Sequence, residues 1–163
     1  MKQLWAPWRM AYIEHGSEET SCIFCNKPKQ SDLREALVMV QTAHSTIMLN
    51  KYPYNNGHLL LAPKRHEKHL PNLSTEEYTD LNEALRRSVD IVRKVLNPGG
   101  INLGMNLGAA AGAGIEDHLH WHVVPRWNGD TNFMPVVAET KVISQHLLDS
   151  YDRLKPHFEY LSS

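Results

Sequence analysis

Three histidines occupy alternate positions late in the chain, at His118, His120 and His122. Apolar residues lie between and after them, so the stretch 117–126 has the pattern of a β-strand with one wet face, which bears the histidines, and one buried face. Successive histidines on such a face would lie roughly 6.5–7 Å apart. Imidazole titrates closer to neutrality than any other unperturbed side chain, so this row suits nucleophilic attack, acid–base catalysis or metal binding. The alternative is an ordinary half-exposed strand that is rich in histidine. The residues expected to face the core are Leu119, Trp121 and Val123.

A run of glycine and alanine precedes the histidines and includes Gly108, Gly112 and Gly114. Small residues let backbone N–H groups approach an anion closely, and successive N–H groups in a turn can form a nest for phosphate oxygens. The run lacks the lysine and the following helix of the P-loop, which excludes that motif. It therefore predicts either a phosphate cradle or a flexible turn between two strands.

The only two cysteines, Cys22 and Cys25, are separated by two residues. Such a pair is a poor basis for a secreted disulfide framework and a better one for metal or redox chemistry. A redox pair should open a helix after a strand, and the residues that follow, 26–28, do not continue a helix. Free buried thiols are the remaining alternative.

Short apolar runs bounded by turn-forming residues predict the strands that would position these groups. They lie at 36–40, 45–50, 58–63, 101–107 and 117–126, and the first two are expected to form a hairpin. Ser74 and the acidic residues after it predict the start of a long helix, whose apolar residues recur at helical spacing as far as Leu96. Another amphipathic helix is expected within 139–161, ending near Pro156. The pattern predicts an α+β domain with a mainly antiparallel sheet of five strands, one long helix between the third and fourth strands, and a C-terminal helix.

The length and charge of the chain limit what it could do. At 163 residues it is long enough for one domain with a sizeable core. A formal net charge of −1 gives no global attraction to a nucleic acid polymer or to an anionic membrane, so function must depend on a local site. No apolar run approaches the length of a membrane span, and the first residues do not lead into a signal peptide, so a cytoplasmic location is expected.

Two motifs in the same chain resemble the histidine triad (HIT) family of nucleotide hydrolases and transferases. The first is His-x-His-x-His with the apolar residues after it, at 118–126. The second combines Asn50, the Gly57-His58 pair eight residues later, and a Pro-Lys-x-His segment at 63–66. The resemblance covers 22–126. It implies a single HIT-like domain over 1–163, in which residues 1–21 form an N-terminal arm, 22–126 the core and 127–163 a C-terminal extension. The flanks at 4–9 and 125–134 look like the bacterial branch that includes diadenosine tetraphosphate phosphorylases.

The resemblance implies a role for each matched residue. His120 would be the nucleophile that forms a covalent nucleotidyl-histidine, while His122 and His58 would contact phosphate oxygens. At least some of the triad must stay neutral to limit repulsion between like charges, and a neutral ring is the nucleophilic form. Asn50 would bind ribose hydroxyls, unless it only bonds its own turn. The phosphates would be held by His122, Asn106, Gly108, Gly112 and Gly114, and the same turn or strand-end alternative applies to Asn106.

Some family members bind a structural zinc ion through a cysteine pair and two histidines, here Cys22, Cys25, His66 and His118. Two sulfurs and two nitrogens suit tetrahedral zinc. The resemblance implies no organic cofactor and a homodimer, with the arm around Trp5 and Trp8 as a natural place for subunit contact. One departure concerns Gly114 and Ile115, which stand where members commonly carry Ser, Thr or Gln in a loop one residue shorter. Leaving-group stabilisation is therefore expected from backbone N–H groups.

The leading hypothesis is an enzyme that cleaves dinucleoside polyphosphates through nucleotidyl-His120, with phosphate or water as the acceptor. A nucleoside phosphoramidate or adenylate hydrolase would use the same nucleophile on a smaller leaving group. A different metal chemistry would place a catalytic metal between His58 and the triad. A nucleotide-binding module without turnover is the non-enzymatic alternative.

Overall fold

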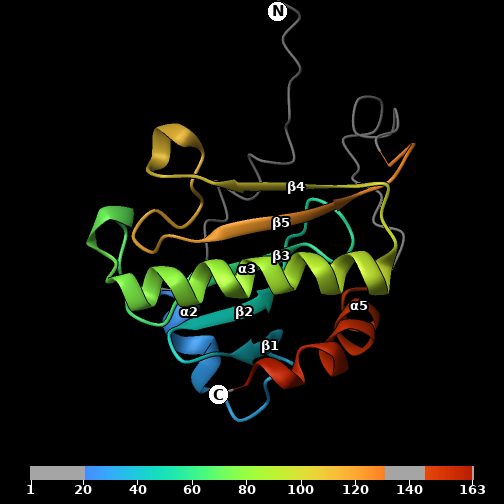
Figure 1. The fold of residues 1–163 in the computed structure, drawn as a ribbon, viewed down its shortest axis with the longest axis horizontal. Helices are drawn as coiled ribbons and strands as arrows, with labels where there is room; N and C mark the ends of the chain where they lie inside the picture. Colours follow the sequence, from blue (N-terminus) through green and yellow to red (C-terminus); the bar gives the residue numbers. More distant parts are fainter. Residues whose placement is uncertain (1–20, 131–145, 163) are drawn as a thin grey trace, which may run out of the picture.

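The computed structural model describes residues 21–130 and 146–162, which form a five-stranded antiparallel sheet with helices (Figure 1). This confirms the predicted α+β class. The strand order is β1-β2-β3-β5-β4. The strands are β1 (Val38–Gln41), β2 (Ser45–Leu49), β3 (Leu59–Pro63), β4 (Gly100–Met105) and β5 (Trp121–Arg126). The α-helices are α2 (Ile23–Asn26), α3 (Thr75–Leu96) and α5 (Leu147–Leu154), and the 3-10 segments are Lys27–Lys29, Leu70–Asn72, Ala109–Ala111, Lys155–His157 and Glu159–Leu161.

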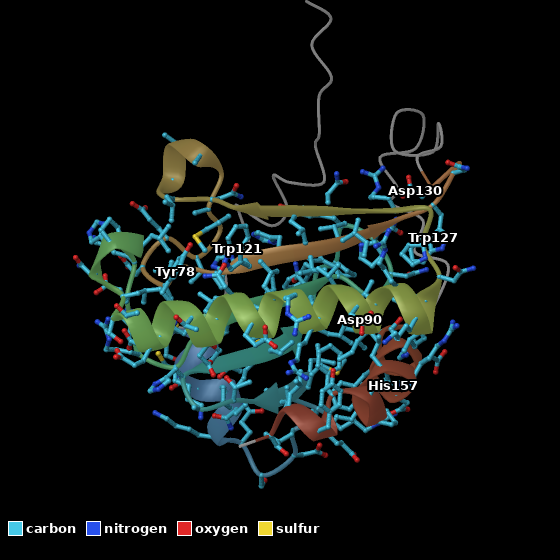
Figure 2. All side chains as sticks on the ribbon, in the orientation of Figure 1. Tyr78, Asp90, Trp121, Trp127, Asp130 and His157 are labelled. Carbon is cyan, nitrogen blue, oxygen red and sulfur yellow. The ribbon has the colours of Figure 1, made fainter. Side chains whose placement is uncertain are left out.

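The two faces of the sheet carry different layers. Alternate residues of β2, β3 and β5, such as Ile47, Leu61 and Val123, enter the main core with buried residues of α3 and α5. Trp121 lies between β5 and α3 at the edge of this core (Figure 2). The residues between them on the strands point the other way, where a smaller apolar cluster gathers around Phe24 of α2. The face of β4 and β5 that bears His122 is on this second side, beyond α2.

The long helix α3 begins and ends with the groups that its sequence predicts. The hydroxyl of Ser74 accepts the N–H of Glu77, and the carboxylate of Glu77 accepts the N–H of Ser74, which is a capping box. Asn97 ends the helix in the left-handed conformation, with φ of 48°. α3 spans 22 residues and packs across β2, β3 and β5, so it supports the sheet behind the triad.

Two contacts tie the β1 edge of the sheet to the helices. The turn between β1 and β2 is tied to α3 because Asp80 accepts hydrogen bonds from the hydroxyls of Thr42 and Ser45, both at 2.6 Å. The antiparallel pairing of β1 with β2 confirms the expected hairpin. α5 ends at Leu154, just before the predicted Pro156, and the hydroxyl of Tyr151 donates to the carbonyl of Val38.

The strand predicted for 117–126 is shorter than expected, because β5 begins only at Trp121. His118 therefore lies in a bend, and His120 in irregular backbone directly before the strand. The alternation itself is confirmed, since Leu119 and Val123 are both buried in the main core. The histidine side is not a wet face, however: His118 is 0% exposed and His120 is 4% exposed. The cluster on α2 and the segments around the triad cover them.

Several sequence predictions fall outside the described residues. They are the N-terminal arm with Trp5 and Trp8, and the part of the C-terminal extension at residues 131–145. Over the residues that the structure does describe, no helix has both the length and the apolar character required to cross a bilayer.

Candidate active site and metal site

His120 is held in one orientation by its own backbone neighbourhood. Its Nδ1 lies 2.9 Å from the carbonyl oxygen of His118, and a carbonyl can only accept, so Nδ1 carries the proton. Nε2 of the neutral ring then keeps a lone pair. Phe24 packs against the ring at 4.8 Å between centroids. The local fold therefore leaves one nitrogen of His120 unprotonated, which is the form that a nucleophile requires.

A chain of hydrogen bonds fixes the proton on His122. The backbone N–H of Tyr54 donates to Nδ1 of His58 at 3.0 Å, so the proton of the neutral His58 ring is on Nε2. That Nε2 lies 3.0 Å from Nδ1 of His122, which must accept. The neutral ring of His122 therefore carries its proton on Nε2, as a donor. The rings of His120 and His122 are 4.8 Å apart between centroids, so the N–H donor of His122 lies beside the ring of His120.

Burial keeps both of these rings neutral at neutral pH. It lowers the pKa of His120 from its usual value, an effect that the hydrogen bond to His118 partly offsets. For His122, burial and then the neighbouring His120 lower the pKa to about 4. Two adjacent neutral imidazoles avoid like-charge repulsion, and a neutral ring is the form that attacks phosphorus.

The two asparagines with expected nucleotide contacts are engaged with local backbone. The side-chain oxygen of Asn50 accepts the N–H of Tyr52 at 2.9 Å, and its amide lies 3.3 Å from Nδ1 of His58. The amide of Asn106 donates to the carbonyl of Gly112 at 3.3 Å. These are the local contacts that the sequence left open as alternatives. They place Asn50 beside His58 and tie Asn106 to the glycine loop.

The glycine loop forms a tight turn just before the triad. Gly108 and Gly112 have φ of 86° and 87°, which L side chains rarely adopt, and a 3-10 turn lies between them. Ile115, at one of the two places where the sequence departs from the family pattern, packs against the apolar cluster around Phe24. It has no polar group to offer a phosphate. Polar contacts from this segment would therefore come from backbone N–H groups.

The four residues expected to bind metal converge in space. The ligand atoms of Cys22, Cys25, His66 and His118 all lie within 4.8 Å of one another. Nδ1 of His118 is 3.2 Å from the sulfur of Cys22 and 3.6 Å from that of Cys25, and Nδ1 of His66 is 3.4 Å from Cys25. The ligand atoms of a tetrahedral zinc site are roughly 3.3–3.8 Å apart. The group can therefore hold a metal ion with little rearrangement.

Neighbouring contacts orient these ligands. Nε2 of His118 donates to the carbonyl of Pro63 at 2.8 Å, which leaves the lone pair of its Nδ1 directed at the cysteines. Burial is the main cause that lowers the pKa of His118, to about 4, so the ring is neutral and able to bind metal. The carbonyl of Glu67 accepts the N–H of Leu119 at 2.8 Å, and this bond joins the segment of His66 to that of His118.

Two aromatic residues at the site were not identified from the sequence. The ring of Tyr54 stacks on His58 at 4.9 Å, and Phe24 contacts both His118 and His120. Tyr54 stands four residues before His58, and Phe24 lies between the cysteines. That proximity in sequence to recognised residues is the only signal that could have indicated them.

Comparison with known proteins agrees with this arrangement. The family model described as HIT domain matches residues 33–129, which is more than half of the chain. This chain belongs to the HIT domain family. The part matched to the HIT domain includes His58, His66 and the triad, whereas the two cysteines precede it.

The relatives of this HIT protein include enzymes by name. An AP-4-A phosphorylase from Mycobacterium tuberculosis is 37% identical over 158 residues, which cover 92% of this chain and 80% of the relative. A bis(5'-adenosyl)-triphosphatase from Dictyostelium discoideum is 33% identical over 133 residues, covering 78% of this chain and 89% of the relative. A solved structure of a Zn-bound histidine triad family protein from Mycobacterium smegmatis has a TM-score of 0.64 at 24% identity, over 86% of this chain and 95% of that one. This structure shares the fold.

Proposed function

We propose that this HIT protein cleaves dinucleoside polyphosphates by transferring a nucleotidyl group first to His120 and then to phosphate or water. The hydrogen bond from Nδ1 of His120 to the carbonyl of His118 carries the proposal, because it leaves the lone pair on Nε2. The substrate class is supported by the names of the relatives, an AP-4-A phosphorylase and a bis(5'-adenosyl)-triphosphatase.

In the first step, Nε2 of His120 attacks the α-phosphorus of the substrate. A P–N bond forms while the P–O bond to the remaining polyphosphate breaks, and the leaving oxygen takes the electron pair. With diadenosine tetraphosphate, the leaving group is ATP, which departs as a stable anion. The ring becomes cationic, and the carbonyl of His118 stabilises this charge through the bond to Nδ1–H.

In the second step, an oxygen of the acceptor attacks the same phosphorus. The P–N bond breaks, its electron pair returns to Nε2 of His120, and the proton of the acceptor is released. Phosphate as the acceptor yields ADP, and water yields AMP. The oxygens of the phosphoryl group would receive hydrogen bonds from Nε2–H of His122 and from backbone N–H groups of the loop 108–114. Asn50 is proposed to bind ribose, which requires its turn contact with Tyr52 to open or be shared.

We propose further that Cys22, Cys25, His66 and His118 hold a structural zinc ion. Two sulfurs and two nitrogens, with three sulfur–nitrogen distances of 3.2 to 3.6 Å, suit tetrahedral zinc. Zinc would tie α2 to the segments of His66 and His118, and thereby hold the carbonyl that orients His120. Four further points stay predictions. They are an N-terminal arm before a core over 22–126, the homodimer, the cytoplasmic location and the lack of a nucleic acid polymer as partner.

Incubation with diadenosine tetraphosphate, with and without inorganic phosphate, tests the proposed reaction. ADP and ATP that form only when phosphate is present would identify a phosphorylase. AMP and ATP formed without phosphate would identify a hydrolase. Absence of turnover under both conditions would contradict the proposal.

A further inference from the structure

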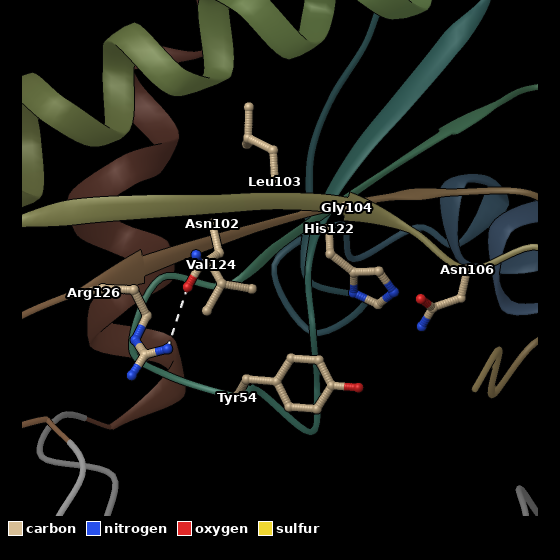
Figure 3. Close-up of a pocket in the computed structure, with 8 residues that line it drawn as sticks. All are labelled: Tyr54, Asn102, Leu103, Gly104, Asn106, His122, Val124 and Arg126. Carbon is tan, nitrogen blue, oxygen red and sulfur yellow. Dashed lines mark hydrogen bonds between the residues drawn. The ribbon is translucent and has the colours of Figure 1, made fainter. Parts of the chain in front are cut away.

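A cavity of about 300 Å³ lies beside His122, on the sheet face away from α3 (Figure 3). It extends along β5 from His122 past Val124 to Arg126, and Tyr54 lies across from these residues. Its volume is at the lower end of the range for small-molecule sites. The cavity therefore continues from the triad in the direction away from His120.

The floor of this cavity is one face of the ladder between β4 and β5. Asn102 pairs with Val124, and Gly104 pairs with His122. Gly104 has no side chain, and a Cβ built on it would meet nothing within 4 Å. The space next to His122 is therefore open because the residue opposite it is glycine.

The far end of the cavity presents a guanidinium whose charge is already balanced. Nε and one terminal nitrogen of Arg126 donate to the two carboxylate oxygens of Asp130 at 2.7 and 2.8 Å. The other terminal nitrogen donates to the side-chain oxygen of Asn102 at 3.2 Å. The ion pair of Arg126 and Asp130 is nearly neutral as a unit. This end of the cavity therefore favours a neutral group that hydrogen-bonds or stacks, and it does not favour a phosphate group.

The near end of the cavity joins the place proposed for the phosphates. Asn106, whose amide donates to the glycine loop at Gly112, lines this end together with His122. Between the two ends, the ring of Tyr54 is 50% exposed and Val124 adds apolar surface. A ligand that fits this sequence of groups has an anionic end near the triad, then a flat ring, then hydrogen-bonding edges.

We propose that this cavity holds the second nucleoside of a dinucleoside polyphosphate, the one that departs with the leaving group. The inference rests on the proposed function. The base stacks on Tyr54, and its edge or the ribose hydroxyls bond to Asn102 and Arg126. In a displacement, the leaving group lies on the side of phosphorus opposite the nucleophile. A cavity that starts at His122 and runs away from His120 is suitably placed to receive it.

Filling the cavity from its floor gives a direct test. Gly104→Val adds a side chain that strands favour, at a position where the Cβ has open space. Binding of three ligands is measured by calorimetry in a His120→Asn background, which prevents turnover: diadenosine tetraphosphate, adenosine 5'-tetraphosphate and AMP. The second ligand has the same phosphate chain as the first but lacks the second nucleoside.

In the His120→Asn protein we expect diadenosine tetraphosphate to bind more tightly than adenosine 5'-tetraphosphate. Adding Gly104→Val should lower the affinity for the dinucleotide alone, by about tenfold. Adenosine 5'-tetraphosphate and AMP serve as the internal controls, because neither carries the second nucleoside. Gly104→Val should leave both of their affinities unchanged.

Equal loss for all three ligands would overturn the inference, since the cavity would then hold the first nucleotide. Unchanged affinity for the dinucleotide, or no advantage over adenosine 5'-tetraphosphate before the change, would overturn it as well. These measurements need no turnover. Failure of the unmodified protein to cleave the dinucleotide would count against the proposed function separately.

Discussion

The imidazole of His120 donates its Nδ1–H to the carbonyl oxygen of His118 at 2.9 Å. The same residue, His118, directs its own Nδ1 at two cysteine sulfurs. One short stretch of backbone therefore connects the candidate metal site to the proposed nucleophile.

Replacing His120 with Ala should lower kcat by roughly a thousandfold or more, because no other side chain can take its place in a covalent step. Rapid quenching of the unmodified protein with diadenosine tetraphosphate should trap one adenylyl group per chain, visible as a mass increase. The exposed His157, beside α5 and far from the triad, offers His157→Asn as a control without effect (Figure 2). A full rate in the His120 variant would rule out the covalent mechanism.

Replacing His58 with Phe should lower kcat about 10- to 100-fold while KM changes little. Phe fills the buried space but donates nothing to Nδ1 of His122, so the proton of His122 is no longer held on Nε2. Steady-state kinetics separate kcat from KM. A change confined to KM would show instead that His58 acts in ground-state binding.

The free energy of unfolding should fall as the pH drops from about 6.5 to 4, and His122 should cause part of this fall. The pKa of His122 is lowered to about 4 by burial, while the unfolded ring keeps its usual value of 6.5. Unfolding therefore takes up a proton between pH 4 and pH 6.5. The stabilising contribution of the neutral His122 ring is full above pH 6.5 and is lost as the pH falls toward 4. Urea unfolding at several pH values measures this dependence. The free energy of unfolding should change less steeply with pH in His122→Asn than in the unmodified protein.

Carboxylates change the stability in a different and more acidic pH range, so their effect can be separated from that of His122. The pKa of Glu77 is lowered to about 2, mainly by its hydrogen bond to Arg65, and that of Glu83 to about 2, mainly by Arg86. Their contributions are present above their usual value of 4.5 and are lost below it. Identical slopes for both proteins between pH 6.5 and 4.5 would contradict the role assigned to His122.

Replacing Cys25 with Ser should abolish stoichiometric zinc and lower Tm by about 10 °C, since a tightly bound ion stabilises the folded state by mass action. Elemental analysis and thermal unfolding with and without a chelator check this. A catalytic metal between His58 and the triad predicts another outcome, in which chelation abolishes turnover at temperatures well below Tm. Unchanged Tm and metal content in the variant would remove the proposed site.

Gly57→Ala should lower the free energy of unfolding by roughly 2 kcal/mol. Gly57 has φ of 71°, and a Cβ there would collide with the side chain of Leu96. Gly100→Ala is the matched control, with open space around the Cβ. Equal stability of the two variants in urea would show that neither strain nor the collision matters. Because Gly57 precedes His58, its variant should also lose activity as the histidine shifts.

The elements with a strong local pattern could be predicted from the sequence. Ser74 and Asn97 define α3 because a capping box and a left-handed residue act within a few positions of the chain. The alternation at 118–123 places the histidines opposite the core for the same reason. The strand order β1-β2-β3-β5-β4 depends on pairing between distant segments, which a single sequence does not specify.

The site was predicted as a set of residues and not as a geometry. The resemblance brought together Cys22, Cys25, His66 and His118, which do converge in the structure. The carbonyl of His118 and the N–H of Tyr54 are backbone groups, so no residue type in the sequence marks them. The cavity floor was missed as well, because the pairing of Gly104 with His122 becomes visible only once β4 and β5 are in register.

β5 is paired with a strand on both sides, β3 and β4. Its first residue, Trp121, lies opposite Leu61 of β3 and Met105 of β4. Amides of a central strand exchange with solvent only when the whole domain opens, whereas edge strands and loops exchange by smaller local openings. The slowest hydrogen exchange in the molecule should therefore include β5. Under increasing denaturant, activity and global structure should be lost together, with no inactive but folded state between them.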